Sequence, residues 1–125
     1  MIVLCSFRDL DKYKRGPHDF NYAIVRNLKD SIGNVQQFTR LAPSQGLYET
    51  ALLNKHSESF WSYYHKAFCE ELKSYEKQVG LALLEDMVSE GYEINLLCYC
   101  EDKEKCHRLD VYNALKSRGI ECELY

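Results

Sequence analysis

Apolar and polar positions alternate along this chain in blocks that predict strands and helices in turn. Residues 1–5 and 94–100 are short, nearly continuous apolar runs, the pattern of strands buried on both faces. Residues 22–25 form another apolar segment, which fits either a strand or the start of a helix. Residues 120–124 predict a short strand near the end of the sequence. The pattern therefore predicts a sheet of about four or five strands.

Helices are predicted where apolar residues recur at steps of three and four positions. A first, short helix is expected over 44–53, with Ser44 as its cap. A long amphipathic helix is expected from a stripe of five apolar residues, Phe60, Tyr64, Phe68, Leu72 and Tyr75. A third helix carries the apolar residues of 83–88 and ends at Gly91. The clearest helix covers 106–118 and ends at Gly119, because glycine accepts the left-handed conformation that closes helices.

The order of these elements indicates the fold class. The strand at 94–100, the helix at 106–118 and the strand at 120–124 form a right-handed crossover between parallel strands. A chain of 125 residues is the size of one domain. We therefore expect a single α/β domain over residues 1–125, a three-layer Rossmann-like fold. Its sheet should be short and mostly parallel, with 94–100 as a central strand flanked by helices.

Composition narrows the classes of partner. The formal net charge is −3, so no global basic surface is expected and nucleic acid is not the favoured partner. No apolar run approaches the roughly 20 residues of a membrane-spanning helix. The first residues also lack the pattern of a secretory signal, so the six cysteines are expected to be reduced thiols of a cytoplasmic protein.

Thiol and charged side chains gather where the strand at 94–100 meets the helix at 106–118. They are Cys98, Cys100, Glu101, Cys106, His107 and Arg108. The carboxyl ends of parallel strands share one edge of a sheet, so Arg8 and Arg26 are expected beside them. Arg8 also opens a polar loop, 8–18, whose other cations are Lys12, Lys14 and Arg15. Arginine forks and a helix amino terminus bind anions, which predicts a site for a small anionic ligand.

The cysteines admit several chemistries. Cys106 in the first turn of its helix would have a lowered pKa and act as a nucleophile, with His107 as acid or base. Cys98, in apolar surroundings, is expected to have a raised pKa, as is Cys5. Alternatively, Cys98 and Cys100 are buried small apolar side chains of the strand end.

Zinc is a further possibility for this segment. Cys98, Cys100, Cys106 and His107 together offer the thiolate and imidazole ligands of a structural zinc site. The spacing of Cys98 and Cys100 is tighter than is usual for zinc ligands. The phosphate loop of thiol phosphatases is excluded, because none of these three cysteines is followed six positions later by arginine.

Several motifs together resemble the DUF488 family of small bacterial proteins of unknown function. The residues that carry the resemblance are Leu97-Cys98-Tyr99, Cys106-His107-Arg108, Leu41-Ala42-Pro43-Ser44, Phe60 and Tyr64, and Val25-Arg26. The resemblance implies a Rossmann-like fold and a strand at 22–25 that leads to Arg26, but no established reaction. Cys100 stands where the family usually has glutamate, with Glu101 displaced by one position.

These observations lead to one leading expectation and two alternatives. We expect a protein that binds a phosphorylated, nucleotide-like small molecule at the carboxyl edge of its sheet, with processing of that molecule as an open extension. The expected ligand-binding residues are Arg8, Arg26, Ser44, Tyr64, Cys98, Glu101 and Arg108, with Cys106 and His107 as candidate catalytic residues. The alternatives are a zinc-stabilised interaction module and a protein-binding adaptor or inhibitor. The residues leave open whether a reaction follows binding.

Overall fold

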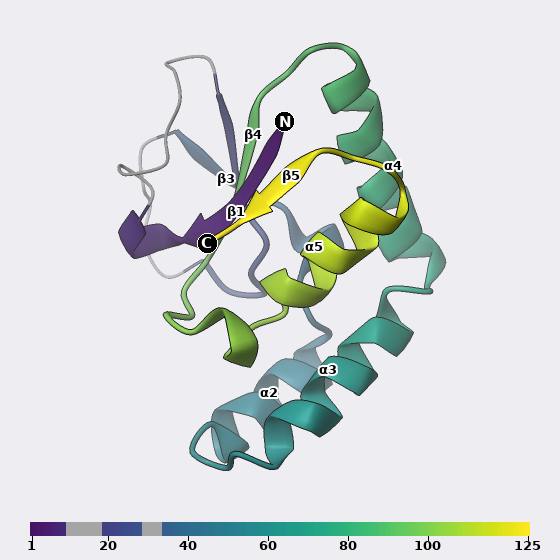
Figure 1. Cartoon of the computed structure of the whole chain (residues 1–125). Helices are drawn as coiled ribbons and strands as arrows, with labels where there is room; N and C mark the ends of the chain where they lie inside the picture. Colours follow the sequence, from purple (N-terminus) through teal and green to yellow (C-terminus); the bar gives the residue numbers. More distant parts are fainter. Residues whose placement is uncertain (10–18, 29–33) are drawn as a thin grey trace.

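A five-stranded parallel sheet is the centre of the computed structural model, which describes residues 1–9, 19–28 and 34–125 (Figure 1). The strand order is β3-β2-β4-β1-β5, and every neighbouring pair is parallel. The strands are β1 (Ile2–Ser6), β2 (Phe20–Ala23), β3 (Val35–Gln37), β4 (Ile94–Cys98) and β5 (Cys122–Leu124). The predicted α/β class and parallel sheet are confirmed, and the segment predicted as the central strand is β4.

Four α-helices lie in the described residues: α2 (Gln45–Asn54), α3 (Phe60–Glu71), α4 (Tyr75–Ser89) and α5 (Arg108–Ser117). Short 3-10 turns are η1 (Phe7–Asp9), η2 (Thr39–Leu41) and η3 (Lys103–Lys105). In Figure 1, α4 and α5 lie along the sheet, whereas α2 and α3 lie side by side beyond the strand ends. The helical pair therefore extends the molecule at the edge where β1 and β4 end.

The core explains why the strand sequences are almost continuously apolar. All five residues of β1 and of β4 are buried, because both faces of these strands are covered. Ile2 and Leu4 pack in the main core together with Phe68 of α3 and Leu115 of α5. Val3 and the other alternate residues of β1 belong to a separate apolar cluster. The buried apolar side chains of the four helices all fall in the main core, on one face of the sheet.

The long helix predicted through Tyr75 is two helices. The first, α3, ends at Glu71, and α4 begins at Tyr75, whose side chain is 85% exposed. Ser74 between them is extended, and its hydroxyl oxygen accepts a hydrogen bond from the backbone N–H of Lys77 at 3.4 Å. A serine cap starts a new helix here, so the apolar stripe is correct through Leu72 and wrong at Tyr75.

The start of α5 also differs from the prediction. Cys106 has an extended backbone, with φ −154° and ψ 142°, and His107 is the residue that precedes the first helical position. The helix therefore begins at Arg108, and Cys106 lies outside its first turn. The predicted ends of α4 and α5 are confirmed, since Gly91 and Gly119 have φ values of +91° and +77°.

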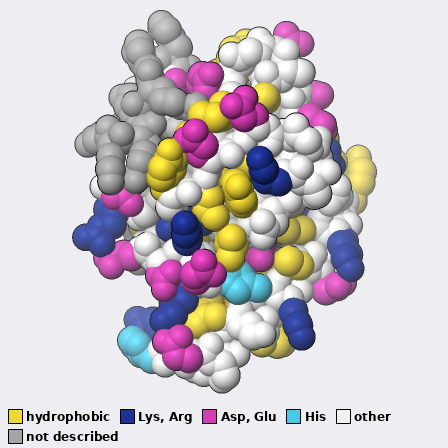
Figure 2. All heavy atoms as spheres, in the orientation of Figure 1, with side chains coloured by type: hydrophobic (Ala, Val, Ile, Leu, Met, Phe, Trp, Pro, Cys, Tyr) yellow, Lys and Arg dark blue, Asp and Glu magenta, His cyan; other side chains and the backbone are white. Residues whose placement is uncertain are grey.

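Charged groups on the surface are mixed in sign. On the face drawn in Figure 2, acidic side chains lie over the upper part, and acidic and basic side chains are mixed over the middle and lower parts. Arg8 lies in η1, whereas Lys12, Lys14 and Arg15 of the same predicted loop lie outside the described residues. None of the described helices is long and apolar enough to cross a bilayer.

Candidate functional site

A cavity of about 270 Å³ opens at the carboxyl ends of β2 and β4. Arg26 and Asn27 reach it from the segment after β2, and Cys98 to Cys100 reach it from the end of β4. The opposite wall comes from α2, α3 and Pro43. This is the crevice beyond the strand ends where ligands of open parallel sheets bind.

The charges around the cavity have one sign. Arg26, Lys55 and Lys105 line it, and no aspartate or glutamate is among the described residues that do. The Nε of Arg26 donates to the carbonyl oxygen of Pro43 at 2.9 Å, which holds the guanidinium at the rim. Lys105 also forms an ion pair with Glu58, at 2.8 Å between Nζ and Oε1. A concave surface with this bias attracts anions.

Aromatic rings form much of the remaining wall. Tyr48, Trp61, Tyr64 and Tyr99 line the cavity, and the ring centroids of Trp61 and Tyr64 are 5.2 Å apart. Tyr64 is buried, and burial strongly raises the pKa of its phenol, which therefore stays protonated. The Nε1 of Trp61 is buried without a hydrogen-bond partner among the described residues. Such rings offer flat apolar faces on which a planar ligand can stack.

Three thiols meet at the inner end of the cavity. The sulfur atoms of Cys98, Cys100 and Cys106 all lie within 4.8 Å of one another and can hold a metal ion. The thiol of Cys106 donates to the sulfur of Cys98 at 3.1 Å. Cys98 and Cys100 line the cavity, whereas Cys106 lies behind them and is fully buried. The group does not include His107, whose Nδ1 is 3.8 Å from the sulfur of Cys106.

A buried arginine supports the thiols from behind. Arg108 is only 2% exposed, and its Nη1 donates to the sulfur of Cys98 at 3.0 Å and to the carbonyl oxygen of Cys100 at 2.8 Å. Its Nε donates to the carbonyl oxygen of Tyr125 at 3.0 Å, which ties α5 to the end of β5. A buried guanidinium needs such partners, and the sulfur of Cys98 is the one that can carry a compensating negative charge.

The order of thiol acidities is the reverse of the sequence-based expectation. Burial, together with the neighbouring thiols, raises the pKa of Cys106 well above its usual value. Burial also disfavours the Cys98 thiolate. That effect is outweighed by hydrogen bonds from the thiols of Cys100 and Cys106 and by the charge of Arg108, so the pKa of Cys98 falls well below its usual value. Cys5 behaves as expected, because burial raises its pKa to about 11. Of the three neighbouring thiols, that of Cys98 is therefore the most acidic.

His107 is a neutral imidazole with a defined tautomer. Its Nε2 donates to the carbonyl oxygen of Ile24, and burial lowers the pKa of the ring. The proton on Nε2 leaves Nδ1 with a free lone pair, on the side of the Cys106 sulfur. The ring lies in the cavity wall and packs edge-on against Phe68. His107 can therefore accept a proton or a hydrogen bond at Nδ1.

The structure brings together some of the predicted site residues and separates others. Those that line the cavity are Arg26, Tyr64, Cys98, Cys100 and His107. Arg8 lies apart, with a largely exposed guanidinium whose Nη1 pairs with Oε1 of Glu101 at 2.7 Å. Ser44 caps α2, as its sequence position predicted, and its hydroxyl donates to Oε2 of Glu71 at 2.6 Å. Cys106 and Arg108 contact Cys98 but do not line the cavity.

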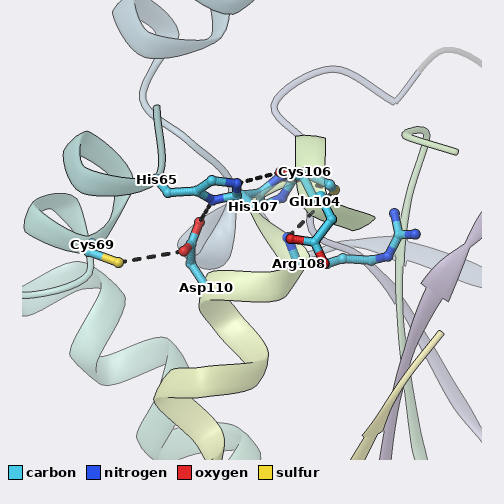
Figure 3. A network of polar contacts seen from close by, with 7 residues as sticks. All are labelled: His65, Cys69, Glu104, Cys106, His107, Arg108 and Asp110. Carbon is cyan, nitrogen blue, oxygen red and sulfur yellow. Dashed lines mark hydrogen bonds and ion pairs between the residues drawn. The ribbon is translucent and has the colours of Figure 1, made fainter. Parts of the chain in front are cut away.

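The sequence did not predict the pairing of His65 with Asp110, which lies beside the site. Nδ1 of His65 lies 2.7 Å from Oδ2 of Asp110, and its Nε2 lies 2.5 Å from the carbonyl oxygen of Glu104 (Figure 3). Both partners are hydrogen-bond acceptors, so the ring satisfies them only when both nitrogens carry protons. Consistently, the hydrogen bond to Asp110 raises the pKa of His65. Residues 45 positions apart give no local signal of this pairing.

Comparison with known proteins agrees with the motif residues. Residues 14–119 match the model of a family described as the active DUF488-N3 subclade. The match includes Arg26, the cavity wall, the three thiols and His107. No curated protein and no solved structure matches the chain. The expected resemblance is therefore confirmed over most of the sequence.

Proposed function

The chain belongs to the DUF488 family, and we propose that it binds a small phosphorylated, nucleotide-like molecule in the cavity at the carboxyl edge of its sheet. The observation that carries the proposal is the composition of the wall. Three cations and four aromatic rings line the cavity, without a carboxylate among the described lining residues. Cations favour phosphate and aromatic faces favour a planar base, so their combination favours a ligand with both groups.

The positions of these residues suggest how the ligand lies. The phosphate is placed against Arg26 and Lys55, where the guanidinium is held by its bond to Pro43. The base is placed against Trp61 and Tyr64 on α3. The volume of about 270 Å³ is close to the lower limit of about 300 Å³ for ligand pockets, which favours a small molecule over a polymer. Arg8 has no part in this arrangement.

The only tryptophan of the chain makes the proposal directly testable. Trp61 lines the cavity, so its fluorescence should report a ligand stacked there. We expect nucleoside monophosphates to change this fluorescence with a saturable dependence on concentration. The matched nucleosides without phosphate should bind about tenfold or more weakly, as expected for the loss of a charge-assisted contact. Equal binding of both, or no response to any nucleotide, would contradict the proposal.

Variants locate the binding to this cavity. Lys55→Gln removes an exposed cavity cation and should weaken nucleotide binding without affecting the fold. Arg26→Gln should weaken it further, because it removes the guanidinium as well as the bond to Pro43. Arg40→Gln is the matched control, since Arg40 is exposed and does not line the cavity. Its affinity should equal that of the unmodified protein.

The zinc-stabilised alternative has one observation in its favour and two against it. Three sulfur atoms lie close enough to share an ion. However, the Arg108 guanidinium already donates a hydrogen bond to the Cys98 sulfur. His107 is also not part of the group of three close cysteine sulfur atoms. Metal analysis of protein purified without chelators decides between the zinc-stabilised module and the anion-binding cavity. About one equivalent of zinc, whose removal lowers the melting temperature, would favour the metal module over the anion-binding cavity.

A further inference from the structure

Cys98 and Cys106 differ in a way that suits them to act as a pair. Their sulfur atoms are 3.1 Å apart, although the residues come from different segments, the end of β4 and the segment before α5. Cys98 lines the cavity, and Cys106 lies behind it. We propose that Cys98 and Cys106 form a peroxide-sensitive thiol pair, in which Cys98 is oxidised first and Cys106 then closes a disulfide with it. This inference does not depend on the proposed nucleotide ligand.

The surroundings of Cys98 supply the reactive form. The Nη1 of Arg108 donates to its sulfur at 3.0 Å, and the thiol of Cys106 donates to the same sulfur at 3.1 Å. A sulfur that accepts two hydrogen bonds, one of them from a buried cation, is stabilised as the thiolate. The thiolate, rather than the thiol, attacks peroxides.

The cavity gives access that suits a small oxidant. Cys98 is 1% exposed, and it is one of the residues that line the cavity. Hydrogen peroxide is about as small as water, so it is the kind of oxidant that would approach the sulfur from this cavity. Cys106 is also 1% exposed but does not line the cavity, so it meets the oxidised Cys98 before it meets the oxidant.

The reaction has two balanced steps. The Cys98 thiolate attacks one peroxide oxygen, the O–O bond breaks, and hydroxide leaves while the sulfur becomes a sulfenic acid. The sulfur of Cys106 then attacks the Cys98 sulfur, its S–H proton and the sulfenic hydroxyl leave as water, and the S–S bond forms. The two thiols are oxidised by two electrons in total, and one peroxide is reduced.

Other thiols are less well placed to resolve the sulfenic acid. The sulfur of Cys98 contacts the backbone carbonyl oxygen of Cys5 at 3.9 Å, and the Cys5 sulfur is not in the group of three close sulfur atoms. Cys69 lies on α3 beside Asp110, and Cys122 lies on β5 near Tyr112. Cys100 is within 4.8 Å of Cys98, so it is the main competitor, and the products distinguish it from Cys106.

Mass spectrometry of the oxidised protein tests the inference. Reduced, chelator-treated protein is exposed to about one equivalent of hydrogen peroxide, the remaining thiols are alkylated, and the peptides are mapped. We expect a peptide in which Cys98 is linked to Cys106, with the loss of two thiols per chain. Cys106→Ser should stop at a Cys98 sulfenic acid that a dimedone probe traps, and Cys98→Ser should leave Cys106 reduced.

One control variant and three contrary outcomes make the test of the thiol pair decisive. Cys122→Ser removes a buried cysteine far from the pair and should oxidise as the unmodified protein does. A disulfide between Cys98 and Cys100, or oxidation confined to the exposed Cys69, would overturn the proposal. So would a Cys98 that stays reduced until the protein is denatured. If Cys106→Ser does not fold, the linked peptide of the unmodified protein alone decides.

Discussion

His65 on α3 and Asp110 on α5 are joined by a 2.7 Å contact between Nδ1 and Oδ2 (Figure 3). The other ring nitrogen contacts the carbonyl oxygen of Glu104 in η3. One imidazole therefore ties together the helix that carries Trp61 and Tyr64 and the turn that carries Lys105. All three of these residues line the cavity, so this contact joins two parts of its wall.

The first prediction concerns the pH dependence of the stability that the contacts of His65 with Asp110 and Glu104 provide. The pKa of His65 is raised in the folded protein, so its contribution to the free energy of unfolding is full below the unfolded pKa of about 6.5. It is lost as the pH rises through the folded pKa. His65→Ala should therefore lower the free energy of unfolding by about 1–3 kcal/mol at about pH 6, and by less at about pH 9.

Denaturant titrations at the two pH values measure this difference. His56→Ala is the matched control, because His56 is exposed in the turn between α2 and α3, and its effect should be within about 0.5 kcal/mol at both pH values. An effect of His65→Ala that grows with pH would contradict the assignment of a protonated ring.

The second prediction concerns Ser44, which sequence reasoning placed both as a helix cap and as a ligand residue. Its hydroxyl accepts from the N–H of Leu47 at 3.2 Å and donates to Glu71 at 2.6 Å. Ser44→Ala should lower the free energy of unfolding by about 1–2 kcal/mol while leaving nucleotide affinity within about twofold. Ser59 precedes α3 without a capping hydrogen bond, so Ser59→Ala should cost less than about 0.5 kcal/mol. If Ser44→Ala instead weakened nucleotide binding and left the free energy of unfolding unchanged, Ser44 would be a ligand-binding residue.

The third prediction concerns the order in which buried thiols react. The pKa of Cys98 is lowered by its hydrogen bonds and by Arg108, whereas burial raises the pKa values of Cys5 and Cys106. Limited iodoacetamide treatment near neutral pH should therefore label Cys98 before either of the others. Arg108→Gln should slow the labelling of Cys98 by about tenfold or more, because the thiolate loses its counter-charge. Peptide masses give the order, and first labelling at Cys106 would contradict the assignment.

The fourth prediction separates two glycines by their backbone. Gly119 has a φ of +77°, so Gly119→Ala should lower the free energy of unfolding by about 1 kcal/mol. Gly46 lies in the first turn of α2 with open space around it, so Gly46→Ala should raise the free energy of unfolding by about 0.5 kcal/mol. Thermal unfolding of the two variants measures both signs, and equal effects would show that the α5 ending is wrong.

Helix ends show how far local sequence signals reach. Ser44 and Gly119 were placed correctly because capping depends on residues within one turn. The apolar stripe nevertheless continued through Tyr75, where Ser74 starts a new helix and the ring is exposed. Periodicity alone did not reveal the break between α3 and α4, because the apolar residues on both sides of the break keep the spacing of a single helix.

The sequence by itself determined the α/β class, the central strand and the segment that holds the thiols, because periodicity, capping and the family motifs are local or linear properties. Only the tertiary structure decided which thiol is the most acidic. The Arg108 guanidinium donates a hydrogen bond to the sulfur of Cys98, ten positions away in the sequence. Cys98 lines the cavity, whereas Cys106 does not. The pairing of His65 with Asp110 was decided in the same way. Acidity depends on distances and burial that arise from packing, and spacing along the chain does not encode them.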